Sequence, residues 1–235
     1  MDPKLRPVHA AASPFLAETL DRKNIHAFVT EAAAALPAGS RVLDAGAGDA
    51  PYAALFAHCD YRTSDWEHSP HAGGRTADVI GSLEALPVED TSFDAVMTTQ
   101  VLEHVRDPLA VLRELHRIVR PGGSLWLTAP LVWELHEEPF DFFRYTSYGL
   151  ESLIGDAGFA EIDVRPLGGY FTTLGQLLRN LGSATGLGSG PRLSGRVLSL
   201  VTWRLAPLIA RLDRLDERRV LPLGYAARAV RPETS

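Results

Sequence analysis

The chain has 235 residues, of which 46% are hydrophobic, so one sizeable core with an appendage is expected. Its formal net charge of −6 disfavours a nucleic-acid-binding protein, which needs a basic footprint. The single cysteine, Cys59, excludes an internal disulfide and a cysteine-rich zinc site, and it fits a reducing compartment. The sequence has neither an N-terminal stretch of signal-peptide type nor an apolar run long enough to span a membrane, so we expect a cytoplasmic protein.

Strands and helices alternate along the predicted chain. Residues 1–39 form a helical lead-in, in which Asn24 caps a helix that Pro37 and Gly39 end. A core then covers residues 40–167, a helical cap or insertion covers 168–220, and a last strand and tail cover 221–235. The strands are expected at residues 41–44, 61–65, 76–80, 93–98, 124–128, 160–167 and 224–230. The helices of the core are expected at residues 50–58, 108–119 and 147–157.

This alternation predicts an α/β fold, a Rossmann-like, mostly parallel sheet with helices on both faces and a helical insertion before the last strand. In such sheets, ligands bind beyond the carboxyl ends of the strands. We therefore expect the loops after Asp44, Asp65, Ile80 and Thr98 to converge on a binding site.

Two features near the first two strands indicate a nucleotide-like ligand. Gly46 and Gly48 follow the first strand directly, and glycines there let the backbone turn tightly and let a ligand approach it. Asp65 ends the second strand, where a carboxylate can accept hydrogen bonds from both ribose hydroxyls. These two features also fit nicotinamide-binding proteins.

The middle of the chain separates these alternatives. The stretches 86–94 (LPVEDTSFD), 100–105 (QVLEHV) and 117–123 (RIVRPGG) follow the glycine loop in order. Together with that loop they resemble the class I S-adenosylmethionine-dependent methyltransferases of the type 11 group, over about residues 40–167. The resemblance implies a seven-stranded sheet with an antiparallel last strand, and a cofactor that is converted to S-adenosylhomocysteine.

The resemblance also implies the cofactor-binding residues. Asp44, Gly46, Ala47 and Gly48 would surround the methionine end, and Asp65 would hold the ribose with Trp66 beside the adenine. Ser82 and Leu83 would line the adenine pocket, and Gln100 would lie near the methionyl part. Two positions depart from the family pattern: Ala50 stands where a third glycine is common, and Ser82 where an acid often binds the adenine amino group, with Asp78 as a spare acid nearby.

The stretch 130–146 resembles an HxxPxDxxRxT segment of one bacterial subset of these enzymes, often associated with glycan and natural-product pathways. It should help to form the pocket of the methyl acceptor. We expect His136, Asp141 and, after the fourth strand, His104 as candidate catalytic bases. The expected acceptor-binding residues are Trp133, Phe140, Arg144 and Tyr145. Asp141 and Arg144 could equally pair with each other and pin the loop, and His136 could be structural.

We expect no metal site, because His136, Glu137 and Glu138 are too close in sequence for a dedicated one. Methyl transfer from a sulfonium needs mainly an aligned nucleophile, so a catalytic triad is not expected. The acceptor would be a small molecule, such as a glycan, a nucleotide sugar or a natural-product intermediate, methylated on oxygen or nitrogen.

The charge is unevenly distributed. Residues 1–178 hold 13 basic and 25 acidic side chains, whereas residues 179–231 hold ten arginines and three acids. Leucines and a valine at helical spacing between residues 198 and 215 predict one apolar stripe, with Pro207 kinking or splitting the helix. Three alternatives remain for this segment: a packing helix beside the acceptor pocket, a dimer contact, and docking on a membrane surface.

Two other classes of function remain open. A catalytically inactive methyltransferase fold could act as a binding module, because this fold has no obligatory catalytic residue. An enzyme that acts on an anionic lipid or a quinone at a membrane surface is the other alternative. The oligomeric state, monomer or homodimer, is not fixed by the sequence.

Overall fold

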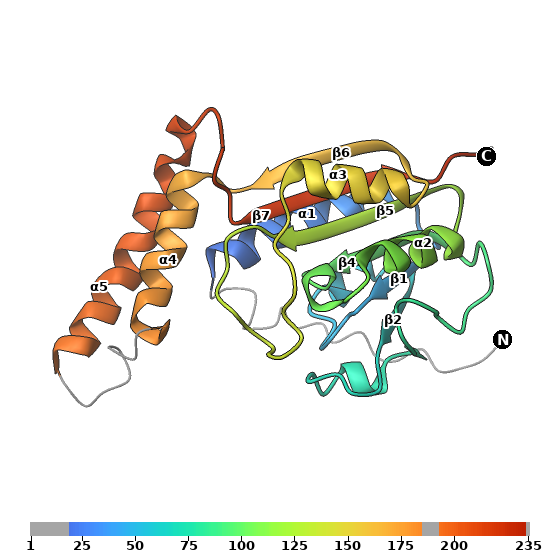
Figure 1. Cartoon of the computed structure of the whole chain (residues 1–235), viewed down its shortest axis with the longest axis horizontal. Helices are drawn as coiled ribbons and strands as arrows, with labels where there is room; N and C mark the ends of the chain where they lie inside the picture. Colours follow the sequence, from blue (N-terminus) through green and yellow to red (C-terminus); the bar gives the residue numbers. More distant parts are fainter. Residues whose placement is uncertain (1–18, 185–192, 234–235) are drawn as a thin grey trace.

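The computed structural model describes residues 19–184 and 193–233, so the first eighteen residues of the expected lead-in lie outside the described residues. One sheet with helices on both faces makes up the body, and a helical hairpin projects beyond the end of the sheet (Figure 1). Within the described residues, no helix combines the length and the apolar character that crossing a membrane requires.

The sheet has seven strands in the order β3-β2-β1-β4-β5-β7-β6. Their bounds are β1 Arg41–Ala45, β2 Asp60–Asp65, β3 Val79–Ile80, β4 Phe93–Thr99, β5 Val119–Pro130, β6 Ala160–Leu167 and β7 Gly224–Val230. The pairs among β1 to β5 are parallel, and β7 runs antiparallel between β5 and β6. This arrangement confirms the predicted α/β sheet with an antiparallel last strand.

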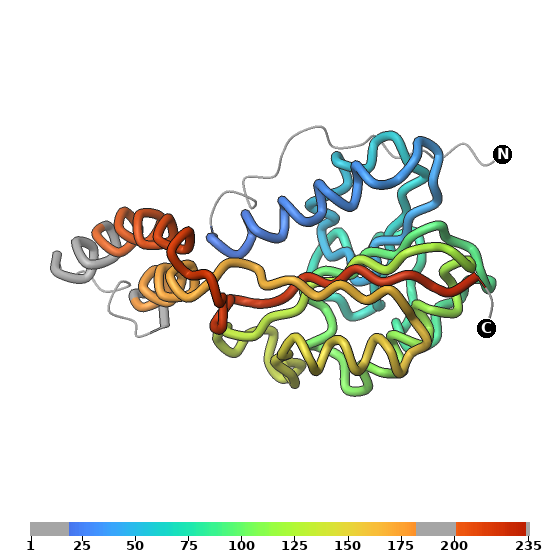
Figure 2. Tube along the Cα trace, turned by 90° about the horizontal axis from the view of Figure 1, so that it is seen from above, coloured from blue at the N-terminus to red at the C-terminus, as the bar shows by residue number. Residues whose placement is uncertain are grey.

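Helices cover both faces of the sheet (Figure 2). Helix α1 (Leu20–Ala35) packs on one face, where Ile25, Phe28 and Val29 are buried with Trp126 of β5. Helices α2 (Pro108–Ile118) and α3 (Ser147–Asp156) pack on the other face. The parallel strands are therefore buried on both sides, which leaves the carboxyl-terminal edge of the sheet as the open edge.

Several predicted elements differ from the structure. The strand expected at residues 76–80 covers only Val79–Ile80, because Thr76 ends the 3₁₀ helix η3 (Gly74–Thr76), and the strand expected at residues 124–128 extends over Val119–Pro130. Helix α1 begins one turn before Asn24, because the hydroxyl of Thr19 accepts a hydrogen bond from the amide of Arg22 and caps it there. The helix expected at residues 50–58 is a short 3₁₀ helix, η2 (Ala53–Phe56), whose neighbour Tyr52 is buried together with Phe56. For helix α1, the prediction that Asn24 is the N-cap is therefore wrong, because Asn24 lies within the helix.

The insertion before the last strand consists of α4 (Tyr170–Ala184), α5 (Leu193–Ala210) and the 3₁₀ helix η5 (Arg211–Leu215). Helix α5 continues through Pro207 to Ala210. The two helices approach closely, since a Cβ on Gly175 would lie 2.8 Å from the carbonyl oxygen of Ala206. Asp213 and Asp216 then accept hydrogen bonds from the backbone amides that begin α4.

Candidate functional site

Loops from the carboxyl ends of the central strands enclose a cavity of about 790 Å³. It has the size and the mixed polar and apolar walls of a small-molecule site. Eight of the residues predicted from the sequence line it: Gly46, Asp65, Trp66, Ser82, Leu83, Gln100, His104 and Phe140. The cavity therefore lies at the edge of the sheet where the sequence places the site.

The glycine loop forms one wall of the cavity through its backbone. Gly46 has φ +76°, and a Cβ there would lie 2.6 Å from the side chain of Val101. The amides of Gly46 and Ala47 both donate to the carbonyl of Ser64, at 2.9 and 3.0 Å, and so fix the loop to the end of β2. Ala50, which stands where the family often has a third glycine, also adopts a left-handed conformation, with φ +49°.

Asp44 lies beneath this loop and is 1% exposed. The hydroxyl of Tyr61 donates to its Oδ2 at 2.5 Å, and its buried Oδ1 has no hydrogen-bond partner among the described residues. Burial, which disfavours the charged form, raises the pKa of Asp44 to about 7. Asp44 lies outside the lining of the cavity, and its Oδ1 is a buried acceptor without a partner among the described residues.

Asp65 ends β2 and holds the loops on both sides of it. Its Oδ2 accepts from the amide of Gly48 at 2.9 Å, and its Oδ1 accepts from the amide of Trp66 at 2.8 Å. The ring of Trp66 meets the ring of Phe140 edge-on, with centroids 5.5 Å apart. Asp65 thus organises the wall of the cavity, and each carboxylate oxygen keeps a further lone pair for a ligand.

The loops after β3 and β4 add Ser82, Leu83 and Gln100 to the lining of the cavity. The hydroxyl of Ser82 accepts from the amide of Glu84 at 3.2 Å. Gln100 has φ +54°, a conformation that side-chain-bearing residues rarely adopt. Its backbone amide donates to the carbonyl of Thr128 at 3.0 Å and its side chain to the Thr128 hydroxyl at 3.2 Å. These bonds to β5 hold the strained residue in place at the end of β4.

The loop over residues 131–146 contributes to the cavity at some positions and holds itself together at others. Both oxygens of Asp141 bind the guanidinium of Arg144, and Arg144 also donates to the carbonyl of Glu134 at 2.9 Å. The hydroxyl of Tyr145 donates to the carbonyl of Leu102 at 2.8 Å. Trp133 packs partly buried at the base of the hairpin. These residues lie outside the lining of the cavity.

The pairing with Arg144 determines the charge state of Asp141. It holds the pKa of the Asp141 carboxyl far below its usual range, so this group stays ionised. Asp141 also accepts from the backbone amide of His136 at 3.0 Å. Its observed contacts are those of a residue that positions the loop.

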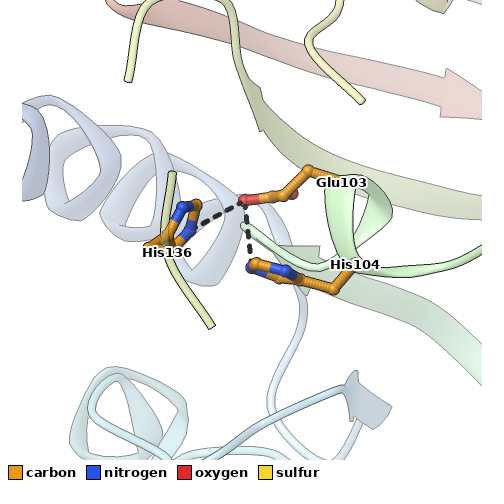
Figure 3. Close-up of side chains that lie close together, drawn as sticks. All are labelled: Glu103, His104 and His136. Atoms are coloured by element: carbon orange, nitrogen blue, oxygen red, sulfur yellow. Dashed lines mark ion pairs between the residues drawn. The ribbon is translucent and has the colours of Figure 1, made fainter. Parts of the chain in front are cut away.

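Three side chains from two segments meet at the edge of the cavity (Figure 3). Glu103 and His104 belong to the 3₁₀ helix η4 (Leu102–His104) after β4, and His136 comes from the loop after β5. The Nε2 atoms of His104 and His136 lie 3.7 and 4.0 Å from Oε1 of Glu103. The two imidazole rings are edge-on, with centroids 4.7 Å apart. Of the three, His104 lines the cavity.

Burial dominates the electrostatics of this cluster. Glu103 is 0% exposed, and burial raises its pKa to about 8. Desolvation lowers the pKa of His104, so its neutral form is favoured. Glu103 lies within the stretch 100–105, but it was not among the predicted site residues. Glu137, which was not among them either, lines the cavity, and its Oε2 lies 4.0 Å from Nε2 of His104.

The segment that contains the glycine loop is similar to known methyltransferases. Residues 43–127 match a family model described as a methyltransferase domain. A ubiquinone biosynthesis O-methyltransferase from Xanthomonas axonopodis pv. citri is 34% identical over 104 residues, which cover 39% of this chain and 44% of the relative. The chain spans less than half the length of this and the other leading curated relatives.

Solved structures show the same fold. A Haemonchus contortus phosphoethanolamine N-methyltransferase, in complex with phosphomonomethylethanolamine and S-adenosylhomocysteine, superposes with a TM-score of 0.57 at 16% identity. That match covers 89% of this chain and 53% of the other. The [4+2]-cyclase SpnF superposes with a TM-score of 0.55 at 20% identity, over 87% of this chain and 80% of the cyclase. At these identities the likeness concerns the fold alone.

Proposed function

We propose that the chain is an S-adenosylmethionine-dependent methyltransferase with a small-molecule acceptor, because residues 43–127 match the family model described as a methyltransferase domain. The observation that carries this proposal is the cavity between the glycine loop, Asp65 and Gln100. Its volume of about 790 Å³ leaves room for a cofactor and an acceptor side by side.

The residues of the cavity fit that cofactor. The backbone at Gly46 can approach a ligand because no side chain intervenes, and Asp65 keeps free lone pairs at the end of β2. Asp44, at the base of the glycine loop but outside the lining of the cavity, keeps a buried acceptor oxygen without a partner among the described residues. Gly46, Asp65, Ser82 and Gln100 would hold the cofactor, with the ring of Trp66 against its base. When bound, S-adenosylmethionine supplies a methyl group that its positive sulfur already activates.

The chain then has to position the acceptor. The lining of the cavity also includes His104, Glu137, Phe140 and Phe142. The two phenylalanines offer apolar walls and exclude water, whereas His104 and Glu137 offer polar contacts. Alignment of the nucleophile with the methyl carbon is the largest contribution that such a site can make, with effective molarities of about 10⁵ M or more.

Ligand binding tests the proposal directly. We expect calorimetry on the full chain to detect tight binding of S-adenosylhomocysteine and no binding of NAD. Mass-spectrometric analysis of metabolites retained by the purified chain should then identify the acceptor class, for which glycans, nucleotide sugars and natural-product intermediates are the first candidates. Binding of NAD with no response to S-adenosylhomocysteine would remove the methyltransferase proposal. Binding of S-adenosylhomocysteine without any turnover would favour a non-catalytic binding module.

A second candidate function is suggested by the helical hairpin. Large apolar side chains of α4, α5 and η5 are exposed along its length, namely Tyr170, Leu174, Leu177, Leu181, Val201, Leu205, Leu208, Leu212 and Leu215. The two helices contact each other instead through small or polar buried residues that include Gly175, Thr202 and Ala206. An exposed apolar surface of this kind is typical of a site that contacts another protein or a membrane.

The positive charge of the hairpin favours an anionic lipid surface as the partner. Residues 201–219 carry five arginines and three acids, and two of the acids, Asp213 and Asp216, are engaged by the amides of α4. Basic side chains beside an apolar row are typical of helices that lie on membranes. Since the similar Xanthomonas enzyme is named for ubiquinone biosynthesis, a lipid-soluble acceptor reached at the membrane is consistent with this surface.

Vesicle sedimentation tests the second candidate. The full chain should sediment with phosphatidylglycerol vesicles more than with phosphatidylcholine vesicles, and salt should weaken the binding. The triple variant Leu205→Ser, Leu208→Ser, Leu212→Ser should lose it, whereas Tyr148→Ser, which changes an exposed aromatic residue on α3, should not. Equal sedimentation of the wild type and the triple variant would overturn the proposal. So would a solution dimer that the triple variant dissociates, because a second copy would then cover the surface.

A further inference from the structure

The cluster of Glu103, His104 and His136 converges on one point. One ligand atom from each residue lies within 4.8 Å of the other two. Both histidines direct Nε2 toward the same carboxylate oxygen of Glu103 (Figure 3). These separations, 3.7 and 4.0 Å, are too long for hydrogen bonds between the partners.

The other ring nitrogen of each histidine identifies the tautomer. Nδ1 of His104 lies 2.7 Å from the carbonyl oxygen of Phe140, and Nδ1 of His136 lies 3.1 Å from that of Glu134. A carbonyl oxygen only accepts, so each Nδ1 carries the hydrogen. In the neutral rings, both Nε2 atoms therefore present a lone pair toward Glu103. A histidine whose Nδ1–H is fixed by a carbonyl is the usual arrangement of a metal ligand.

Among the described residues, the carboxyl group of Glu103 lacks a hydrogen-bond partner. The side chain is 0% exposed, and neither carboxylate oxygen has a hydrogen-bond partner among the described residues. The nearby guanidinium of Arg144 is already bound by both oxygens of Asp141. An ionised Glu103 that faces two nitrogen lone pairs would be costly in this buried position unless a cation lay among them.

We infer that Glu103, His104 and His136 form a binding site for a divalent first-row transition-metal ion such as Zn²⁺, Mn²⁺ or Fe²⁺. Two imidazole nitrogens and one carboxylate oxygen suit these ions better than Mg²⁺ or Ca²⁺, which prefer oxygen ligands. Around a tetrahedral zinc ion, ligand atoms lie about 3.4 Å apart. The cluster thus needs a modest inward movement of its side chains.

The position of the ion would leave coordination sites open toward the cavity. His104 lines the cavity, and Oε2 of Glu137 lies 4.0 Å from its Nε2 on the cavity side. Three protein ligands with an open position are typical of catalytic rather than structural metal sites. The three ligands come from two segments that are 32 residues apart, so sequence spacing alone did not reveal them.

This site also specifies the acceptor chemistry, a step that rests on the proposed methyltransferase function. An acceptor hydroxyl or phenol that coordinates the ion would become more acidic. Its proton leaves to solvent, its oxygen forms the new bond to the methyl carbon, and the carbon–sulfur bond breaks with its electron pair left on sulfur. The substrate class would then be oxygen acceptors, and the reaction O-methylation.

Direct metal binding tests the site without any need for turnover. The full chain is stripped with a chelator and titrated with Co²⁺ and Zn²⁺ by calorimetry, and the visible absorption of bound Co²⁺ is recorded. We expect one ion per chain, with nitrogen-ligand absorption bands for Co²⁺. Glu103→Gln, His104→Gln and His136→Gln should each weaken binding at least tenfold. His26→Ala, which changes a histidine on α1 outside the site, should bind like the wild type.

The outcomes separate the metal site from the proposed function. No binding by the wild type up to millimolar ions, or binding that all three variants retain, would overturn the metal site. S-adenosylhomocysteine affinity and thermal melting of the same samples show whether the variants fold. Should Glu103→Gln fail to fold, the two histidine variants still decide the matter. If the wild type does not bind S-adenosylhomocysteine, that result counts against the methyltransferase proposal, whereas the measured metal binding still stands.

Discussion

The guanidinium of Arg144 binds both carboxylate oxygens of Asp141, at 2.5 and 2.8 Å, and the same carboxylate accepts from the backbone amide of His136 at 3.0 Å. The Asp141–Arg144 pair therefore fixes the backbone at His136, a residue that does not itself line the cavity. Asp141 is 2% exposed at its side chain, so the charges are shielded from water. Breaking one partner of such a pair is costly, because the other is left uncompensated.

Replacing Arg144 with lysine should loosen the loop over residues 131–146. Lysine keeps the charge but lacks the two-pronged geometry that binds Asp141 and Glu134 together. We expect a loss of roughly 1.5–3 kcal/mol in the free energy of unfolding, the scale of lost charge-assisted hydrogen bonds. Urea denaturation gives that value, and limited proteolysis of the loop should become faster.

Arg120→Lys serves as the control, because Arg120 pairs with Asp94 at the surface, where such pairs contribute little. If both variants behave alike, the Asp141–Arg144 pair does not hold the loop.

Replacing Gly46 with alanine should weaken binding of S-adenosylhomocysteine by tenfold or more, where tenfold corresponds to about 1.4 kcal/mol. The added Cβ would lie 2.6 Å from Val101, and φ +76° strains any side-chain-bearing residue. The double variant Gly46→Ala, Val101→Ala should relieve the steric part and keep the backbone strain. Calorimetry on the single and double variants separates the two; an unchanged affinity in Gly46→Ala would show that the loop does not approach the cofactor.

Replacing Asp65 with alanine should reduce the affinity for S-adenosylhomocysteine by roughly 1.5–3 kcal/mol. The variant loses a carboxylate at the end of β2 and frees the amides of Gly48 and Trp66. Asp65→Asn keeps one acceptor oxygen and should fall between the wild type and the alanine variant. Equal affinities for all three proteins would place the ribose contact elsewhere.

The burial of Asp44 predicts a pH-dependent stability. Its pKa is about 7 in the folded chain against a usual value of 3.8, so the folded state binds a proton more tightly than the unfolded state. The free energy of unfolding should therefore fall as pH rises from about 4 to about 7, by on the order of 4 kcal/mol from this group. Below about pH 4 both states are protonated, and the contribution is fully present.

Asp44→Asn should lack this dependence, so it should gain stability relative to the wild type between pH 4.5 and pH 8. Urea denaturation at the two values measures the difference, from which the similar contribution of Asp21 cancels. The same variant should bind S-adenosylhomocysteine more weakly. A constant difference between the two proteins across this pH range would mean that Asp44 is not buried in its charged form.

The sequence predicted those parts of the fold that depend on local patterns. The glycines after β1 and the apolar spacing of α2 are local signals of a turn and of a helix. The cap of α2, Asp107, which accepts from the amide of Ala110, was not among the predictions. Strand β7 was predictable despite the long insertion before it, because residues 224–230 form a short, mainly apolar segment at the end of the insertion. The start of α1 was not, since Thr19 and Asn24 are both good caps and tertiary packing chose the earlier one.

The cluster around Glu103 depended on relations that no local pattern contains. A glutamate next to a histidine in a turn is ordinarily a solvated pair. Burial of Glu103 follows from the loop over residues 131–146, whose amides at Phe142 and Phe143 donate to the Glu103 carbonyl. The exposure of the leucine row on α5 was equally hidden, because the close approach of Gly175 to Ala206 turned a different face of the helix inward. Amphipathic periodicity indicates that a face is apolar, not what covers it.

The bonds from Asp213 and Asp216 to the first amides of α4 join the end of the hairpin to its beginning. The chain thus leaves the body after Gly168 and returns near the same place, before Gly224 pairs with the end of β5. In the connectivity of the sheet, α4, α5 and η5 thus form a single insertion between β6 and β7. Among the described residues, the hairpin takes part in none of the strand pairs. It is held to its surroundings instead by side chains of α4: the amide of Leu20 donates to Gln176 at 2.9 Å, and the hydroxyl of Thr173 donates to the carbonyl of Leu221 at 2.8 Å. A substitution in the hairpin that spares these bonds should therefore leave the sheet unaltered.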